Sequence, residues 1–164
     1  EKYIPPRKGK KHVLRVIREI LFYKPKDAQT NIAEALEFLT RVLKRRSTVF
    51  LISDFLSEGF EKSLQLANKK HDIIAVSIID PREITLPDVG IIDLEDAETG
   101  ETILVDTSSG QVRREFFANN NQRYEGRSSF FKSIGVDHIV VHTDQSYVDP
   151  VVRFFKLRAR RLAG

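Results

Sequence analysis

The run Thr48-Val-Phe-Leu-Ile-Ser53 (TVFLIS), which stops at Asp54, decides the fold class of this 164-residue chain. A short, continuously apolar run is typical of a strand that is buried on both faces of a parallel sheet. A helical pattern follows over residues 59–70, and a second apolar run covers Ile73–Ile79 before Asp80-Pro81 ends it. Strand, helix and strand in this order form a βαβ unit with a right-handed crossover. We therefore predict an α/β fold with an open, mostly parallel sheet and helices on both faces.

Two helices are predicted before this unit. After Gly9, apolar residues recur at helical spacing until Pro25 ends the pattern, and Lys and Arg side chains occupy the opposite face. Asn31 and Glu34 resemble a capping box that opens a second helix. The basic run Lys44-Arg45-Arg46 follows that helix, where positive charge suits the macrodipole. The apolar stripes are Val13, Val16, Ile17, Ile20 and Leu21 in the first helix, and Ile32, Ala35, Leu36, Leu39, Val42 and Leu43 in the second.

Residues 86–106 interrupt the alternation of strands and helices, and we predict that they form an inserted β-hairpin. Val89–Leu94 and Thr102–Asp106 are its strands, and residues 95–100 form an acidic tip. A long helix over residues 111–133, a strand over 137–142 and a last helix from about Val148 follow. In the long helix we expect Val112, Phe116, Phe117, Phe130, Phe131 and Ile134 to be buried. In the last helix we expect Val151, Val152, Phe155, Ala159 and Leu162 to be buried, and Arg153, Lys156, Arg158, Arg160 and Arg161 to be exposed.

The composition is that of one soluble domain, with 41% hydrophobic and 30% charged residues. No apolar run approaches the roughly 18 residues that span a bilayer. The chain has no cysteine, which excludes disulfides, thiolate metal sites and a cysteine nucleophile and fits a reducing compartment. We expect a cytoplasmic location. The chain also has no methionine and begins with EKYIPP, the pattern of a strand already in progress, so we expect a fragment of a larger protein.

Charge is distributed unevenly along the chain. Residues 1–46 hold 13 Lys and Arg against 5 Asp and Glu, residues 80–106 hold 1 against 9, and residues 107–164 hold 10 against 5. This asymmetry predicts a basic and an acidic surface, available for a charged partner or for self-association, unless the charges are only solvated helix faces. No recognised nucleic-acid motif accompanies the basic segments, so we expect no nucleic-acid partner.

Asp54 is the most informative candidate for chemistry. A carboxylate just past the carboxyl end of a buried parallel strand lies where open α/β sheets place their ligands. A metal ion or backbone N–H groups could partner it, or it could cap the following helix. Thr30 precedes the helix that leads into the same strand, and its hydroxyl could ligate a hard cation or cap that helix. The residues alone leave these alternatives open.

Other candidate groups point away from catalysis. His138 and His142 share a strand face but lie about 13 Å apart by strand rise, too far to share one metal. The acidic residues of the hairpin lack the ordered spacing of a calcium loop and read as a solvated tip. No Ser/His/Asp set, phosphate-binding glycine loop or H-E-x-x-H motif is present. We therefore do not expect an enzyme.

Four segments resemble one bacterial family along nearly the whole chain. They are YIPPRKGKKHVLRVIREIL (residues 3–21), TNIAEALEFLTRVLKRRSTVFLISDF (30–55), IIDPREITLPDVGIIDLEDAETGE (78–101) and HTDQSYVDPVVRFFKLRARR (142–161). They are similar to the domain-of-unknown-function family fifty-eight, whose members contain a von Willebrand A-like, Rossmann-type domain and are commonly encoded beside MoxR-type AAA+ ATPases. The resemblance implies that residues 1–164 form a single such domain that lacks its first strands.

The resemblance also implies a metal-ion-dependent adhesion site that binds Mg²⁺ in the intact domain. Thr30 and Asp54 stand at two of its ligand positions, and Asn31 and Ser53 beside them are candidate binding residues. Asn31 replaces an Asp that the family often shows. The D-x-S-x-S element is absent from its expected place, since the Asp-x-Ser that begins at Asp106 lies after the hairpin instead. We therefore expect no well-occupied metal site in this chain, because Mg²⁺ prefers six oxygen ligands.

The function that this implies is a non-enzymatic protein-interaction module. The intact domain would work with a MoxR-type ATPase in the assembly or maturation of other proteins, and any membrane attachment would come through the absent N-terminal part. The alternatives are a Mg²⁺-dependent phosphatase or nuclease centred on Asp54, with Asp80 as a further carboxylate, and a self-association scaffold. Loss of the first strands would leave an exposed edge on the strand 48–53, which predicts a homodimer formed by edge pairing or by a swapped N-terminal arm.

Overall fold

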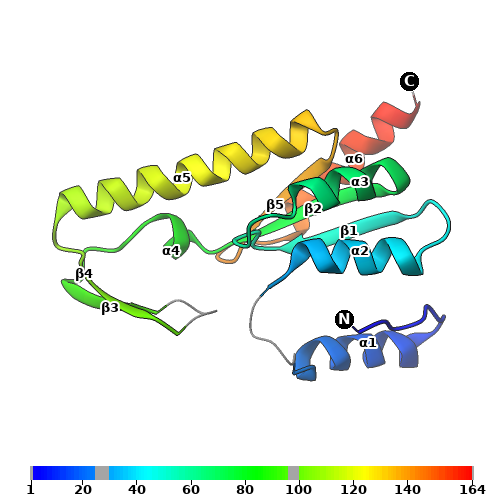
Figure 1. The fold of residues 1–164 in the computed structure, drawn as a ribbon, viewed down its shortest axis with the longest axis horizontal. Helices are drawn as coiled ribbons and strands as arrows, with labels where there is room; N and C mark the ends of the chain where they lie inside the picture. The colour runs from blue at the N-terminus through cyan, green and yellow to red at the C-terminus, as the bar shows by residue number, and fades with distance from the viewer. Residues whose placement is uncertain (1, 25–29, 96–99, 164) are drawn as a thin grey trace.

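The computed structural model of the chain describes residues 2–24, 30–95 and 100–163, without the side chains of 162 and 163. Helices and strands alternate along most of the chain (Figure 1). In order they are α1 (Lys10–Phe22), α2 (Ile32–Val42), β1 (Thr48–Ser53), α3 (Glu61–Lys70), β2 (Asp72–Ile79), α4 (Pro81–Ile84), β3 (Ile91–Glu95), β4 (Thr102–Asp106), α5 (Gly110–Ser133), β5 (Asp137–His142) and α6 (Val148–Ala163). Within these residues, no helix is both long and apolar enough to cross a membrane.

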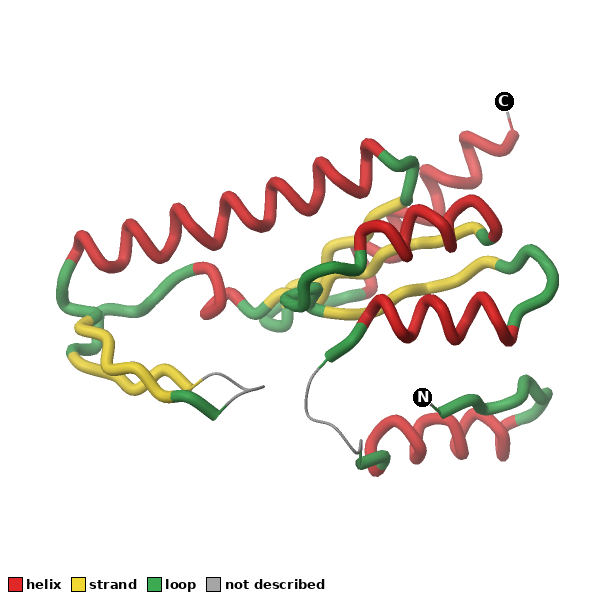
Figure 2. Tube along the Cα trace, viewed as in Figure 1, coloured by secondary structure: helices red, strands yellow, loops and turns green. Residues whose placement is uncertain are grey.

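The main sheet has the strand order β1-β2-β5, and both of its strand pairs are parallel. Thr48 pairs with Asp72, and Ile74 pairs with Asp137. The predicted βαβ unit is confirmed, and so is the class of a mixed α/β fold with a parallel sheet flanked by helices. Figure 2 shows the strands of this sheet in yellow, the helices around it in red and the connecting loops in green.

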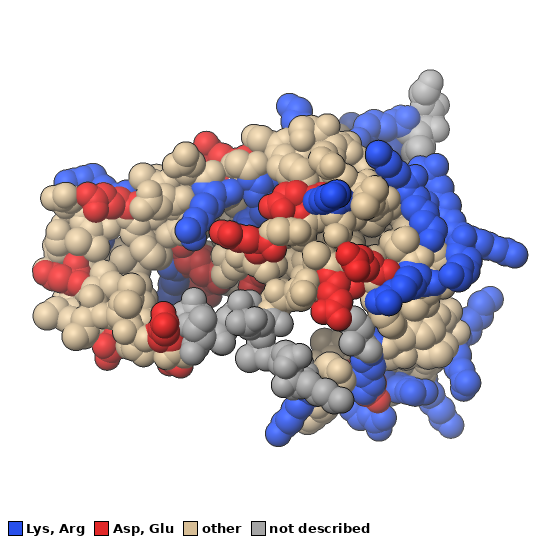
Figure 3. Space-filling model, viewed as in Figure 1, with Lys and Arg blue, Asp and Glu red and all other residues tan. Residues whose placement is uncertain are grey.

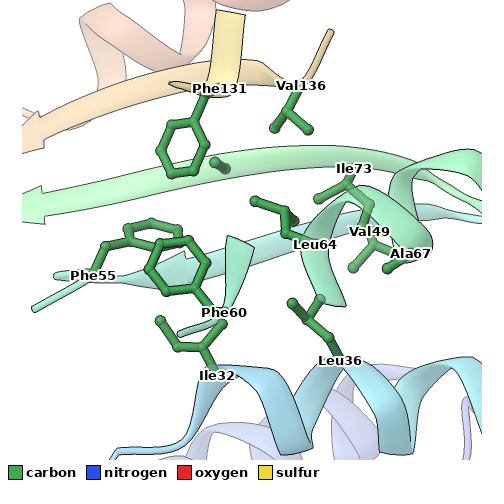
Figure 4. Close-up of a cluster of buried hydrophobic side chains, with 11 residues drawn as sticks. Ile32, Leu36, Val49, Phe55, Phe60, Leu64, Ala67, Ile73, Phe131 and Val136 are labelled. Carbon is green, nitrogen blue, oxygen red and sulfur yellow. The ribbon is translucent and has the colours of Figure 1, made fainter. Parts of the chain in front are cut away.

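The two faces of β2 pack against different helices. Ile73 and Ala75 join a buried cluster with side chains of α2, α3 and α5, including Leu36, Leu64 and Phe131 (Figure 4). The alternate residues of β2, Ile74 and Val76, join a second cluster with β5 and with Phe154 of α6. Because successive side chains of a strand point to opposite faces, the apolar run of β2 is buried on both sides, as its sequence predicts.

Strand β1 differs from its predicted environment. Val49 on one face is buried, but Phe50 and Ile52 on the other face are 45% and 65% exposed. Phe155 of helix α6 contacts this face, with its ring 6.1 Å from that of Phe50. The prediction that β1 is buried on both faces is therefore wrong, because β1 lies at the sheet edge and α6 packs mainly on β2 and β5.

Helix α6 is rotated relative to the prediction. Phe154 is buried, whereas Val152, Phe155 and Ala159 are exposed. Arg158, expected in solvent, is partly buried and forms ion pairs with Asp72 and Asp137, at 2.8 Å from the latter. Phe154 and Arg158 are four residues apart and share a helix face, so turning this face to the sheet buries the ring and pairs the guanidinium. The predicted burial of Leu162 lies outside the described side chains.

Helix C-termini gather at the amino end of the parallel strands. The last turns of α2, α3 and α6 carry Arg41, Lys69, Lys70, Arg160 and Arg161. Positive side chains there complement the negative ends of the helix dipoles. Figure 3 shows Lys and Arg collected at this end of the molecule.

The remaining elements are less embedded. Helix α1 forms as predicted, but it buries none of its residues, and Tyr3-Ile4, expected to end a strand, lies in an irregular segment. The predicted hairpin is confirmed as the antiparallel pair β3–β4, away from the main sheet in Figure 1. Its acidic tip over residues 96–99 lies outside the described residues. Helix α5 runs through Gly126 without a break, and Phe117, expected to be buried, is 45% exposed.

Candidate functional site at the carboxyl end of β1

The loop after β1 places the Asp54 carboxylate in solvent. Asp54 Oδ1 accepts a hydrogen bond from the backbone N–H of Leu56 at 3.2 Å and from the Ser53 hydroxyl at 3.3 Å. Ser53 Oγ in turn accepts the N–H of Phe55 at 3.0 Å. Asp54 does not cap the next helix, because α3 begins only at Glu61. Its carboxylate instead closes a tight turn and remains exposed.

Phe55 holds this loop in an uncommon backbone conformation. Its φ angle of 56° lies in the left-handed region, which is costly for a bulky side chain. The ring is only 4% exposed and packs against Phe60 and Phe131, with ring centres 5.6 Å and 5.1 Å away. Aromatic packing therefore offsets the cost of the backbone conformation and fixes the direction in which Asp54 points.

Arg127 of α5 locks the same loop from the opposite side. Its Nη1 donates hydrogen bonds to the carbonyl oxygens of Asp54 at 2.8 Å and Phe55 at 2.9 Å. Burial lowers the pKa of Arg127, while Tyr124, Asp54 and Glu83 act in the opposite direction. Sequence reasoning missed this residue, although it lies four positions before Phe131 and thus on the buried face of α5.

Two further carboxylates lie near Asp54. Asp80 follows β2, and its Oδ1 accepts the N–H of Arg82 at 2.9 Å to cap α4. Burial raises the pKa of Glu83, and the charges of Asp54 and Asp80 raise it further. Glu83 and Asp54 line a small cavity of about 40 Å³ together with Tyr124 and Arg127. The carboxyl ends of β1 and β2 therefore bring acidic groups and one partly buried guanidinium together.

Thr30 and Asn31 lie at the same end of the sheet. Asn31 Oδ1 accepts the N–H of Glu34 at 2.9 Å, which confirms the predicted N-cap of α2. Thr30 is exposed and precedes this cap by one residue. Ile32 and Phe55 belong to one buried cluster, so the start of α2 and the loop after β1 adjoin each other (Figure 4). The structure therefore brings the four predicted site residues to one region.

A groove of about 360 Å³ runs beside this site between the loop after β1 and α5. Phe55, Phe60 and Phe130 form its apolar lining, and Gly126 leaves room along the helix wall. Arg127 Nε, which is buried, has no hydrogen-bond partner among the described residues. Glu58, Glu61 and Arg123 add charged groups to the lining, so the groove combines an apolar floor with polar groups, as small binding sites commonly do.

A partly buried polar pair lies beneath α5. Ser77 Oγ is 2.8 Å from His138 Nε2, and the His138 ring packs edge-on against Phe131 at 4.9 Å. Burial lowers the pKa of His138 to about 4, with a smaller effect from the positive charge of Arg127. The imidazole is therefore neutral at neutral pH. The sequence offered no signal for this pair, because it depends on the β2–β5 register.

The chain matches, over residues 1–126, the family described as "Protein of unknown function DUF58". It belongs to the DUF58 family. An uncharacterized protein of Mycobacterium avium is 31% identical over 165 residues, covering 98% of this chain and 97% of that protein. An uncharacterized protein of Mycobacterium tuberculosis is 30% identical over 166 residues, and the chain spans about half of it, 52%.

One solved structure is also similar to this DUF58 chain. It is the conserved hypothetical protein BatB from Bacteroides thetaiotaomicron, at 18% identity and a TM-score of 0.40. The match covers 85% of this chain and 62% of that one. The family and these relatives place the chain without assigning an activity, so its function has to be argued from its own site.

The donor set of the described residues does not fit a resident Mg²⁺ ion. They include no group of three His, Asp or Glu side chains arranged to hold a metal. Asp54 offers one carboxylate, and Thr30 and Ser53 offer hydroxyls. Mg²⁺ demands near-octahedral oxygen coordination, so this set is incomplete for a DUF58 domain that would use a metal.

Proposed function

We propose that this DUF58 chain is part of a non-enzymatic protein-interaction module with a von Willebrand A-like fold. The observation that carries the proposal is the exposed Asp54 carboxylate at the carboxyl end of β1, on a loop that Ser53, Phe55 and Arg127 hold in one conformation. In open α/β sheets this position is where ligands bind.

The hydrogen bonds that order the loop support a binding role. A site whose backbone is ordered before binding loses less conformational entropy when its partner arrives. Arg127 donates to two consecutive carbonyl groups, and charge-assisted hydrogen bonds of this kind are stronger than neutral ones. Asp54 itself contributes only a turn-closing contact, so its carboxylate is presented by the loop and does not hold the loop together.

The partner that we propose is a MoxR-type AAA+ ATPase and its client, which the family resemblance implies. The proposal assigns the cation to the intact domain, where a D-x-S-x-S element would add oxygen ligands to Asp54 and Thr30 and an acidic partner residue would bind. The groove beside Asp54 would then receive an apolar side chain of the partner on Phe55, Phe60 and Phe130.

A pull-down of the full-length protein with the ATPase encoded beside it tests this proposal. We expect capture to fall at least tenfold in EDTA and in the Asp54→Ala variant. The matched control is Asp93→Ala, an exposed carboxylate on β3 that should leave capture unchanged. Capture that is indifferent to both EDTA and Asp54→Ala would remove the metal and Asp54 from the interaction.

The second candidate is a Mg²⁺-dependent phosphatase or nuclease. It is favoured by the approach of Glu83 to Asp54, because two neighbouring carboxylates are a common basis for binding catalytic metals. Turnover of a generic phosphoester by the full-length protein in Mg²⁺, lost in Asp54→Asn and Glu83→Gln, would support this function. Equal background turnover in the wild type and both variants would exclude it.

A further inference from the structure

The groove beside Asp54 has one wall from the start of α3 and the loop before it, and the other wall from α5. The rings of Phe60 and Phe130 meet across its floor, with centres 6.5 Å apart, and the ring of Phe55 lies 5.6 Å from that of Phe60. Helix α2 packs against α3 on the side away from α5 (Figure 1). All of the lining comes from these described segments, so the groove does not depend on the outer edge of β1.

Two side chains of the lining carry buried polar atoms that have no partner. Ser57 Oγ and Arg127 Nε form no hydrogen bond within the described part of the chain. Leaving a buried polar group unpaired costs about 1–3 kcal/mol. Arg127 Nη1 already donates to the carbonyl oxygens of Asp54 and Phe55, so Nε remains for another acceptor. A peptide backbone supplies a carbonyl oxygen at every residue and is therefore a suitable occupant.

The rim of the groove carries opposite charges on its two sides. Glu58 and Glu61 lie on the α3 side, Arg123 lies on the α5 side, and all three are exposed. None of the three forms an ion pair with another described residue. Charges that the fold leaves unpaired are available to a partner, and complementary charges fix the orientation in which that partner binds.

We propose that this groove binds a linear segment of a partner protein in which one bulky apolar side chain stands between an acidic and a basic residue. The apolar side chain lies on the three phenylalanine rings, the acidic residue faces Arg123, and the basic residue faces Glu58 and Glu61. An apolar anchor in a pocket with charged groups at the rim is the common anatomy of an interface hot spot. This inference rests on the proposed role as a protein-interaction module and names the chemistry of the segment that is recognised. No cation takes part.

Size and charge distinguish this occupant from others. A groove of about 360 Å³ is near the lower end of ligand sites, which span about 300–1,000 Å³, so it holds one anchor side chain and the adjoining backbone. A purely acidic segment would place a negative charge beside Glu58 and Glu61, and a purely basic one would place a positive charge beside Arg123. Like charges brought together at an interface are unfavourable, which leaves a segment of mixed charge.

Selection of a random-peptide display library on the full-length protein, in buffer with EDTA, tests the proposal. We expect the enriched peptides to share a Phe, Trp, Leu or Ile with an acidic neighbour on one side and a basic neighbour on the other. Fluorescence polarisation then measures the affinity of a labelled consensus peptide, and replacing its anchor with Ala should weaken binding at least tenfold. No enrichment, or an enriched set without this pattern, would overturn the proposal.

Two variants at Gly126 locate the peptide. A Cβ there meets no atom within 4 Å, so Gly126→Leu should fill the groove while α5 stays intact, and Gly126→Ala should leave most of it open. We expect at least a tenfold loss of peptide binding in Gly126→Leu and less than a twofold change in Gly126→Ala. Melting temperatures establish that both variants are folded. Equal affinities in the two variants would mean that the peptide binds elsewhere.

Arg123→Glu tests the role of the rim charges without filling the groove. It makes both sides of the rim acidic, so the consensus peptide should bind at least fivefold more weakly. A peptide whose acidic neighbour is replaced with Lys should then bind this variant better than the consensus peptide does. The matched control is Arg114→Glu, an exposed arginine of α5 outside the groove, which should leave both affinities unchanged. An unchanged peptide preference in Arg123→Glu would contradict recognition by charge.

The failure of this inference can be told apart from the failure of the proposed function. If no peptide binds the groove while capture of the ATPase still depends on EDTA and Asp54, only the inference is wrong. If the peptide binds in EDTA while capture of the ATPase is indifferent to both changes, the groove site stands and the metal-dependent interaction is wrong.

Discussion

Helix α1 carries a longer apolar stripe than α3, yet the two helices have opposite environments. α3 buries Leu64 and Ala67 almost completely, while α1 buries no residue and leaves Ile20 and Leu21 more than two-thirds exposed. The difference arises because α3 connects two paired strands and is drawn across the sheet by the crossover. α1 has no such strands on both sides among the described residues. Amphipathic spacing therefore predicts a helix, but not what covers its apolar face.

The main sheet and the hairpin differ in the same way, because apolar residues are buried in the first and exposed in the second. β2 is buried along most of its length, whereas Ile91, Ile103 and Leu104 of the hairpin are each more than 60% exposed. The hairpin is anchored mainly at its base, where Thr107 accepts the N–H of Val89 at 3.1 Å and donates to Gly90. Arg113 ion-pairs with Asp88 at 2.9 Å at the same base.

The difference in burial between α3 and α1 predicts a large difference in stability between two alanine variants. Leu64→Ala should lower the free energy of unfolding by about 3 kcal/mol, because it leaves a cavity in the buried cluster. Leu21→Ala in α1 should cost less than about 0.5 kcal/mol. Urea denaturation of both variants measures the difference. Similar losses would mean that α1 is packed in solution.

Two arginine variants test whether the main sheet and the hairpin unfold together. Arg127→Gln should cost about 2 kcal/mol, since it removes charge-assisted hydrogen bonds to the loop after β1. Arg113→Gln at the hairpin base should leave global unfolding nearly unchanged and should increase amide hydrogen exchange in β3 and β4. Global destabilisation by Arg113→Gln equal to that of Arg127→Gln would show that the hairpin unfolds together with the sheet.

His138 makes the stability of the sheet body depend on pH. Its pKa is about 4 in the folded chain and about 6.5 when unfolded, so the unfolded state takes up a proton first as the pH falls. The contribution of neutral His138 to the free energy of unfolding should be complete above pH 6.5 and fall by about 1.5 kcal/mol towards pH 4. This loss is smaller than the pKa difference alone would give, because the ring is partly solvated. Thermal denaturation at several pH values across this range measures the change, and the His138→Gln variant should lack it. His12→Gln on α1 is the matched control, and an equal change in both variants would contradict the assignment to His138.

The smallest effect concerns α5, which connects the body to the hairpin. A Cβ at Gly126 meets no atom within 4 Å, so Gly126→Ala should stabilise the chain by about 1 kcal/mol through helix propensity. Gly135, which has a φ of 68° after the same helix, is the control, and Gly135→Ala should destabilise. Calorimetric melting temperatures should move in opposite directions for the two variants. A lower melting temperature in Gly126→Ala would indicate that the groove beside Gly126 is filled.

Local patterns in the sequence were enough to predict the order of the elements and half of the site. Asn31 was expected as a helix cap from its spacing to Glu34, and it caps α2. Asp54 is predicted just past the end of a parallel strand and lies there, although that strand is buried on one face only. The roles of Arg127 and Glu83 could not be predicted in this way, because each depends on a contact across more than 25 positions of the chain.

The α/β class, the parallel βαβ unit and the hairpin can be predicted from the sequence, since each follows from periodicity and turn residues within short windows. Tertiary packing decides which apolar faces are covered. It rotated α6 to bury Phe154 in place of Phe155, left Phe50 and Ile52 exposed, and paired Ser77 with His138. These outcomes depend on strand order and helix rotation, and both are set by the packing of distant segments against one another.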